Sequence, residues 1–220
     1  MPSQNHSKIA KNTLLLYFRM ILVMLITFYT SRVVLSRLGI NDFGIYNVVG
    51  GIVMMFSIVS ASLSSAISRF LTFELGRNNE SKLKTIFSSS IIIQAGLGLI
   101  IILLVETIGV WFLNNKMNIS PERMVAANWV LQCSALAFLV NMLSVPYNAA
   151  IIAHEKMQAF AYVSILEVSL KLGIAFLLYI PWFDSLIVYA VLIVISSLII
   201  RLAYAIYCKQ HFQECHFFLV

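Results

Sequence analysis

The sequence predicts an all-α polytopic membrane protein, and its composition and long apolar stretches are the two observations behind that prediction. Of its 220 residues, 60% are hydrophobic and 11% are charged, whereas an ordinary soluble domain has about 45–50% and about 25%. The mean hydropathy is +0.91. This much apolar sequence cannot fit one soluble core, so the composition excludes a water-soluble globule, a disordered chain and a secreted disulfide scaffold.

Six stretches are long and apolar enough to cross a bilayer, which takes about 20 helical residues. Residues that start or end helices lie between them: Asp42 precedes the second stretch, Pro121 the fourth and Asp184 the sixth, and Pro181 ends the fifth. We therefore expect one six-helix membrane lobe over residues 1–220, without a solvated domain. The predicted spans are residues 14–35, 43–67, 86–113, 125–150, 160–180 and 186–207.

The distribution of basic residues predicts that both termini lie in the cytoplasm. With the N-terminus inside, nine Lys and Arg residues fall in inner segments and four in outer segments, as expected for cytoplasmic loops. The inner set is Lys8, Lys11, Arg69, Arg77, Lys82, Lys84, Lys156, Arg201 and Lys209, and the outer set is Arg32, Arg37, Lys116 and Arg123. Trp111, Trp129 and Trp182 then fall toward the outer interface. The expected location is the cell inner membrane, with several passes.

The fifth predicted span carries two charges, Glu167 and Lys171. Each costs roughly 3 kcal/mol near the bilayer centre, which cancels most of what the apolar residues of this span contribute. We therefore expect the charged face to point into a helix bundle or a wet cavity. The acid lies four residues before the base, the favourable order for a helical ion pair. Two interpretations stay open: a self-neutralised pair that aligns helices, or the wall of a substrate or ion path.

Three arginines are further candidates for a cationic cavity. Arg19 lies inside the first span, where its side chain either extends to the lipid headgroups or meets an anionic group in a cavity. Arg32 lies at the outer end of the same span and Arg69 at the inner end of the second. For both of these, anchoring at the membrane interface is the alternative.

Other polar residues within the spans predict local features. The amides of Asn128, Gln132 and Asn141 need hydrogen-bond partners in the hydrocarbon region. Pro146 predicts a kink near the inner end of the fourth span. Glu106 is a carboxyl group about two turns from the outer end of the third span, and the sequence does not identify its partner.

No motif points to an enzyme, a cofactor or a nucleic-acid partner. The sequence has no Ser-His-Asp constellation, no His-rich helix face and no phosphate-binding glycine motif. Cys208, His211, Cys215 and His216 have zinc-binding chemistry, but their spacing matches no familiar zinc finger, so we expect no metal site. The formal charge of +6 is explained by basic loops.

Three segments resemble a known family: SRVVLSRLGINDFGIYNVVGGIVMMF, ASLSSAISRFLTFELGRNNESKLKTIF and VPYNAAIIAHEKMQAFAYVSILEVSLKLGIAFLL. The most distinctive parts are Arg37-Leu38-Gly39 followed by Gly44-Ile45-Tyr46, and the SRF…ELGR run. Together they resemble the N-terminal half of bacterial polysaccharide, or O-antigen (Wzx-type), flippases of the multidrug/oligosaccharidyl-lipid/polysaccharide exporter superfamily.

The resemblance implies one lobe of a two-lobe flippase with a central cavity open alternately to each side. Such a protein moves an undecaprenyl-diphosphate-linked oligosaccharide from the inner to the outer leaflet, as in polysaccharide and lipopolysaccharide biosynthesis. The implied substrate-binding residues are cations that meet the diphosphate or acidic sugars, with one acid that tunes Lys171. They are Arg19, Arg32, Arg69, Lys171 and Glu167.

The family's chains are roughly twice as long as this one, so the expected partners include a missing C-terminal lobe or a second copy. The other expected partners are the lipid-linked oligosaccharide and membrane lipids. Two alternatives stay open. One is a cation-coupled multidrug antiporter, for which Glu106 and Glu167 are the candidate intramembrane carboxylates. The other is a non-transporting membrane subunit, or an integral membrane enzyme of lipid-linked sugar chemistry.

Overall fold

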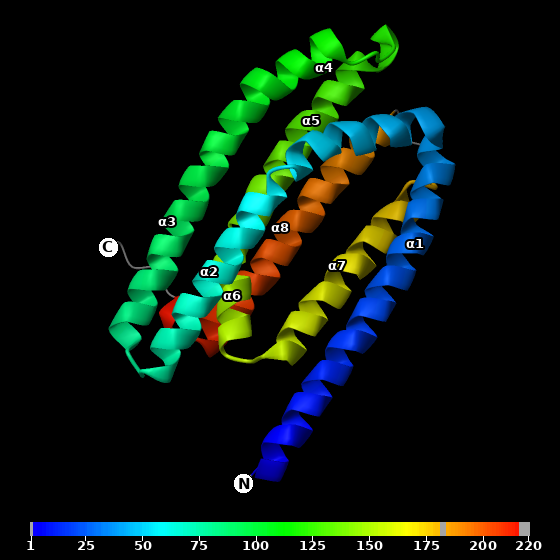
Figure 1. The fold of residues 1–220 in the computed structure, drawn as a ribbon. Coiled ribbons are helices and arrows are strands. Elements are labelled where there is room, and N and C mark those ends of the chain that lie inside the picture. Colours follow the sequence, from blue (N-terminus) through cyan, green and yellow to red (C-terminus); the bar gives the residue numbers. More distant parts are fainter. Residues whose placement is uncertain (1, 181–183, 216–220) are drawn as a thin grey trace.

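The computed structural model describes residues 2–180 and 184–215, and every regular element in this part of the chain is helical. Pro181 and Trp182 lie outside the described residues, as does His216. The helices lie lengthwise beside one another in an elongated bundle (Figure 1). They are α1 (Pro2–Met54), α2 (Ser57–Gly76), α3 (Glu80–Leu104), the π-helix η1 (Val105–Gly109), α4 (Val110–Lys116), α5 (Pro121–Met142), α6 (Val145–Ala153), α7 (Met157–Leu177), α8 (Ser185–His211) and the 3₁₀-helix η2 (Gln213–Cys215).

Five helical stretches in the described residues are long and apolar enough to cross a membrane, which confirms an all-α polytopic membrane protein. Four of them correspond to the first, third, fifth and sixth predicted spans, although the fifth helix ends at Leu177 and not at residue 180. The remaining one, Pro121–Ala153, covers the fourth. The second predicted span, residues 43–67, does not form one helix. Its first part continues α1 to Met54, a turn interrupts the helix, and its second part belongs to α2.

A bend at Gly39 explains why α1 runs past the predicted first loop. Gly39 has φ 78° and ψ 170°, which is not helical, although the helix continues on both sides. A glycine adopts this positive φ without the steric cost that a side chain brings. Figure 1 shows residues 2–38 running along the bundle and the segment after the bend crossing its upper end before α2 descends.

The chain runs back and forth between the two ends of the bundle. The turns after α2 and α6 lie at the end where α8 finishes and from which α1 begins, and the loop between α4 and α5 lies at the opposite end (Figure 1). The start and end of the described chain therefore lie at the same end of the bundle. That this end of the bundle faces the cytoplasm remains a prediction.

The start of α8 and the joint between α5 and α6 follow the sequence signals. The side chain of Asp184 caps α8 by accepting hydrogen bonds from the backbone N–H groups of Leu186 and Ile187, at 3.0 and 3.4 Å. The fourth predicted span breaks between Met142 and Val145, next to Pro146, so the predicted kink is confirmed.

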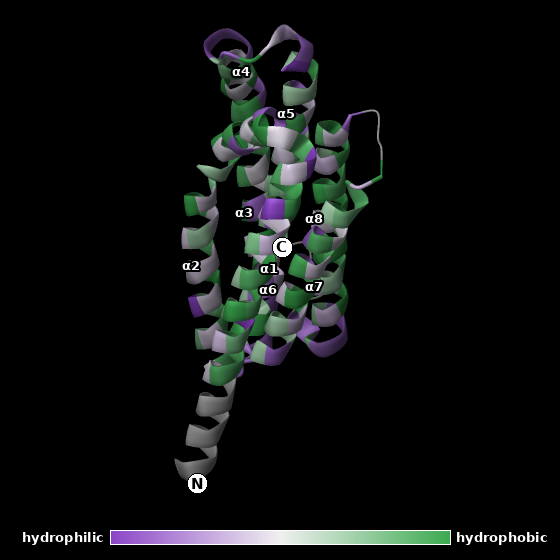
Figure 2. Ribbon diagram, turned by 90° about the vertical axis from the view of Figure 1, so that its right-hand side faces the viewer, coloured by the Kyte–Doolittle hydropathy of each residue, from purple (hydrophilic) through white to green (hydrophobic). Residues whose placement is uncertain are grey.

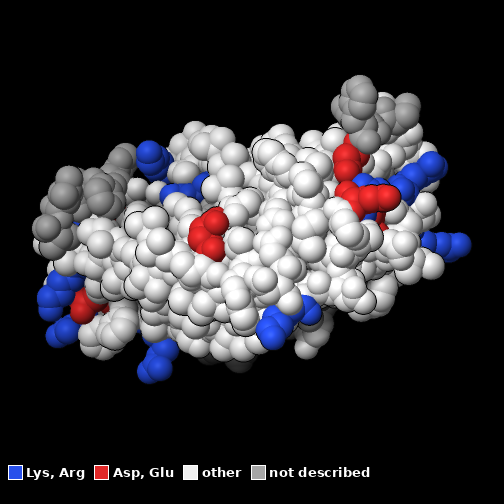
Figure 3. All heavy atoms as spheres, turned by 90° about the horizontal axis from the view of Figure 1, so that it is seen from above, with Lys and Arg blue, Asp and Glu red and all other residues white. Residues whose placement is uncertain are grey.

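Apolar side chains both fill the bundle and cover its outside. One buried cluster includes Val49, Leu131 and Leu186, and a second includes Phe87 and Tyr204. Many large apolar side chains are also exposed, among them Phe28, Phe73 and Trp111. Figure 2 shows that hydrophobic residues predominate along the helices and that hydrophilic residues gather at the turns. Charged side chains lie mainly toward the two ends of the face shown in Figure 3. This surface pattern suits a lipid environment.

Candidate functional site

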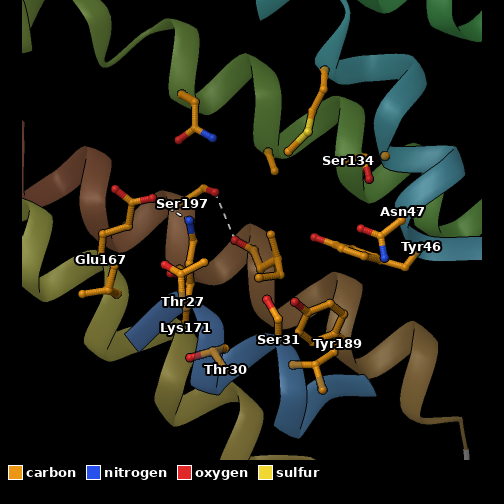
Figure 4. A pocket seen from close by; sticks show the side chains of 18 of the residues that line it. Thr27, Thr30, Ser31, Tyr46, Asn47, Ser134, Glu167, Lys171, Tyr189 and Ser197 are labelled. Carbon is orange, nitrogen blue, oxygen red and sulfur yellow. Dashed lines mark hydrogen bonds and ion pairs between the residues drawn. The ribbon is translucent and has the colours of Figure 1, made fainter. Parts of the chain in front are cut away.

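A cavity of about 320 Å³ lies between α1, α5, α7 and α8 (Figure 4). Hydroxyl and amide groups from α1, α5 and α8 face it, together with one charged pair from α7. The uncharged polar residues are Thr27, Thr30, Ser31, Tyr46, Asn47, Ser134, Asn141, Tyr189, Ser196 and Ser197. So many polar side chains inside a membrane bundle indicate a water-filled or ligand-binding space.

The bend at Gly39 lets α1 form two walls of the cavity. Thr27 and Thr30 come from the limb before the bend, and Tyr46 and Asn47 come from the limb after it (Figure 4). A straight helix could not bring both groups to one space, because 16 residues of helix span about 24 Å. The glycine therefore builds the site as well as the fold.

Several polar atoms at the cavity wall remain available to a ligand. Thr30 is 8% exposed, and its hydroxyl oxygen has no hydrogen-bond partner in the described part of the chain. The Asn47 amide nitrogen donates to the Phe43 carbonyl oxygen at 2.7 Å, which leaves its side-chain oxygen as an acceptor. The rings of Tyr46 and Tyr189 meet edge to face, with centroids 4.8 Å apart. These groups suit a ligand rich in hydrogen-bonding groups.

The predicted ion pair of the fifth span lies at this cavity. Lys171 Nζ donates to Glu167 Oε1 at 2.7 Å, so the predicted helical pair is confirmed. The two side chains are 46% and 43% exposed, and both line the cavity. The pair therefore contributes one positive and one negative group to the wall.

Arg19 does not line the cavity. Its guanidinium lies over the Phe160 ring of α7, 4.3 Å from the centroid. Its Nε and Nη1 atoms are buried, and no described residue accepts a hydrogen bond from them. Phe160 belongs to α7, the helix that also carries Glu167 and Lys171, so Arg19 contacts the same helix as the charged wall.

Arg32 and Arg69 lie elsewhere. Both side chains are exposed, Arg32 on α1 and Arg69 on α2, and neither lines the cavity. The structure thus brings Lys171 and Glu167 together at the cavity, with Arg19 nearby, and leaves the other two cations outside it. A role for any of the five in substrate binding remains a prediction.

The comparison with protein families agrees with this architecture. The MatE family profile matches residues 16–177, well over half of the chain. The chain belongs to the MatE family. This family is part of the exporter superfamily named above, and its members are transporters rather than enzymes. No curated protein matches the chain, and no solved structure matches it.

The polar cavity wall of this MatE protein is what sequence reasoning missed. The prediction concentrated on charges, whereas most of the lining residues are neutral. A signal was present: Thr27, Thr30 and Ser31 recur at helical spacing in an otherwise apolar stretch. The contribution of Tyr46 could not be foreseen, because it depends on the bend at Gly39.

Of the three amide side chains expected to need partners, Asn128 and Gln132 find them on the opposite side of α5, whereas Asn141 lines the cavity. Gln132 donates from Nε2 to Glu106 Oε2 at 3.0 Å, which also identifies the partner of Glu106. The side chains of Asn114 and Asn128 exchange two hydrogen bonds, at 3.2 and 3.1 Å. None of these four lines the cavity of the MatE chain, so Glu106 is not placed at this site.

Charged residues also form ion pairs at the two ends of the MatE bundle. At one end, Arg123 of α5 lies 2.9 Å from both Asp42 of α1 and Asp184 at the start of α8. At the other end, His154 pairs with Glu214 and stacks on Phe212, with ring centroids 4.1 Å apart. These contacts hold helices in place at positions remote from the cavity.

The pKa of Glu214 reflects its position in the second of these clusters. Burial acts to raise the pKa of this carboxyl group, but the hydrogen bond from His154 and the positive charges of His154 and Lys84 lower it, and the lowering prevails. Cys208 and Cys215 are buried close by, and the hydrogen bond with the Cys208 thiol, together with burial, raises the pKa of Cys215. The described residues contain no group of three metal-binding side chains.

Proposed function

We propose that this MatE transporter moves a lipid-linked oligosaccharide from the inner to the outer leaflet of the membrane. The sugar head crosses through the polar cavity while the lipid tail stays in the bilayer. The observation that carries this proposal is the cavity wall itself, in which neutral hydroxyl and amide groups far outnumber charges. Sugars present many hydroxyl groups, and such a wall can pair with them.

The size of the cavity supports a site completed by a second bundle. Its volume of about 320 Å³ is at the lower end of the about 300–1,000 Å³ typical of small-molecule sites. An oligosaccharide needs more room than this. Alternating access also needs two bundles that move about a shared site. A second lobe or a second copy would supply the opposite wall.

The cationic side chains near the cavity are suited to bind the diphosphate of the substrate. Arg19 has two buried guanidinium nitrogens without a partner among the described residues, and guanidinium groups bind phosphate oxygens through paired N–H donors. Lys171 offers a second positive group at the wall once the substrate competes with Glu167. We propose that the diphosphate binds toward Arg19 and the sugars toward Thr30 and Tyr46.

A flipping assay tests this function. The protein, with whatever bundle completes it, is reconstituted in vesicles that carry a fluorescent polyprenyl-diphosphate oligosaccharide in one leaflet. We expect Thr30→Val, which keeps the side-chain volume and removes the hydroxyl, to slow flipping. Thr13→Val, outside the cavity, is the matched control and should not slow it. Vesicles without any protein-dependent flipping of this lipid would contradict the proposal.

The second candidate is a cation-coupled multidrug antiporter, and the position of Glu167 favours it. This carboxylate lines the cavity and is 43% exposed, so an organic cation could displace Lys171 from it. Efflux of such a cation, driven by a proton or sodium gradient and abolished by Glu167→Gln, would favour this function over oligosaccharide flipping.

A further inference from the structure

Glu167 and Lys171 are the only charged side chains that line the cavity in the described part of the chain. Lys171 Nζ donates one hydrogen bond to Glu167 Oε1 at 2.7 Å. The other carboxylate oxygen of Glu167 and the remaining N–H donors of Lys171 have no hydrogen-bond partner among the described residues. The cavity wall therefore has no net charge, yet both members of the pair keep bonding capacity for a ligand.

Opening this ion pair costs little by itself. Both side chains are nearly half exposed and lie on the same helix, and ion pairs of this kind contribute little to stability. Hydrogen bonds between oppositely charged groups are about twice as strong as those between neutral groups. A ligand that meets both charges of the pair therefore replaces one weak internal contact with two strong external ones.

The charge of the ligand decides whether the opened pair is left balanced. A ligand that brings only an anion to Lys171 leaves Glu167 without a counter-ion on a helix apolar enough to span the membrane. A ligand that brings only a cation to Glu167 leaves Lys171 unpaired in the same way. An unpaired charge in this environment is unfavourable. A ligand with both an ammonium group and an anionic group satisfies both side chains at once.

Two hydroxyl groups on the same side of the cavity favour an ammonium group as the cation. The Thr27 hydroxyl donates to the Val23 carbonyl oxygen at 2.7 Å, and the Ser197 hydroxyl donates to the Ile193 carbonyl oxygen at 3.0 Å. Because a hydroxyl group has one proton, these two oxygens can only accept from a ligand. Figure 4 shows both residues on the side of the cavity that carries the ion pair. The N–H groups of an ammonium ion match such acceptors.

We infer that the cavity selects a zwitterionic sugar head, with an ammonium group bound by Glu167 and an anionic group bound by Lys171. The inference rests on the proposed function and adds the charge pattern of the substrate. The two side chains are four residues apart, which is about 6 Å along the helix axis. The two charges of the ligand therefore belong to one sugar ring, or to a sugar and the phosphate attached to it.

Flipping of four matched lipids in the vesicles described above tests this charge pattern. All four carry the same polyprenyl diphosphate, and the attached sugar is a neutral hexose, its 2-amino sugar, its uronic acid or its 2-amino uronic acid. We expect the 2-amino uronic acid to be flipped about tenfold faster than the neutral hexose and the uronic acid at limiting lipid concentration. The 2-amino sugar distinguishes the two sources of the anion. It should be equally fast if the diphosphate is that anion, and slower if the carboxylate is.

Substitutions in the pair should change the order of the rates as well as their size. Glu167→Gln should lose the advantage of the amino group, whereas Lys171→Met should keep that advantage and lose any advantage of the carboxylate. The double variant Glu167→Gln/Lys171→Met should flip all four lipids at similar rates. The matched control Glu122→Gln/Lys82→Met changes two exposed residues outside the cavity and should keep the original order.

The outcomes separate this inference from the proposed function. Flipping of all four lipids at equal rates would overturn the inference and leave the function intact, and so would an order of rates that the double variant retains. If none of the lipids is flipped, the proposed function fails, and calorimetric binding of the four free sugars to the purified protein decides the inference. Tighter binding of the 2-amino uronic acid supports it, and equal binding overturns it. If the variants do not fold, the order of rates in the unchanged protein decides.

Discussion

The two faces of α5 differ in the side chains they carry and in how closely those side chains pack. Toward α1 and α8, Ser134 and Asn141 face a cavity in which polar atoms stay accessible. Toward α3, Leu131 is 0% exposed and Leu139 closes tightly on Gly98. The face of α5 toward α1 and α8 therefore exposes hydrogen-bonding groups, whereas the face toward α3 packs closely against its neighbours. Substitutions on the packed face should reduce stability, and substitutions on the cavity face should reduce transport.

The largest loss of stability is expected on the packed face. Gly98→Val places side-chain atoms where Leu139 now lies, and overpacking of this kind costs about 1–3 kcal/mol. Gly96→Val is the matched control, because no atom lies within 4 Å of a Cβ atom built there. Thermal unfolding in detergent measures both. Equal losses in the two variants would show that the cost comes from helix propensity and not from packing.

The next largest effect is expected at the end of the bundle where α5 meets α1 and α8. Arg123→Met removes the partner of Asp42, whose side chain is 9% exposed, and of Asp184. An unpaired buried carboxylate is costly, although the 40% exposure of Arg123 reduces the effect. We expect a loss of about 1–2 kcal/mol, measured by thermal unfolding. Arg123→Lys should recover part of it.

A smaller, pH-dependent effect is expected at Glu214. Because its pKa in the folded protein lies below the ordinary 4.5, the carboxylate stabilises the fold above pH 4.5, and this contribution disappears as the pH falls through the lowered pKa. Glu214→Gln should flatten the fall in Tm between pH 5 and pH 3 by a few degrees. An unchanged pH profile in this variant would contradict the role of the His154 contact.

The smallest effect on stability is expected at the cavity. Lys171→Met breaks an ion pair whose two side chains are nearly half exposed, and such helical pairs contribute about 0.3–0.5 kcal/mol. Transport should nevertheless fall strongly, because the wall loses its positive group. Parallel measurement of Tm and vesicle transport checks this. A variant that loses stability without losing transport would reverse the distinction between the two faces.

Much of the fold could be predicted, because lipid imposes simple rules on sequence. The helical class, the Asp184 cap and the break near Pro146 all follow from local signals in the chain. The prediction that residues 43–67 form one helix was wrong, because hydropathy does not report the direction of the backbone. Residues 43–54 are apolar whether they cross the membrane or extend α1.

The site was predicted less completely than the fold. The spacing of Glu167 and Lys171 was enough to predict their pairing and their approach to a cavity. Arg32 could not be assigned in the same way, because helix rotation decides whether a side chain points inward, and a single arginine does not define that rotation. Tyr46 and Tyr189 are brought together by contacts between distant segments, which no local pattern encodes.

The positive φ at Gly39 has a mechanical consequence. Since Thr30 and Tyr46 lie on opposite sides of this one residue, rotating its two backbone dihedrals changes the width of the cavity while both limbs of α1 keep their internal hydrogen bonds.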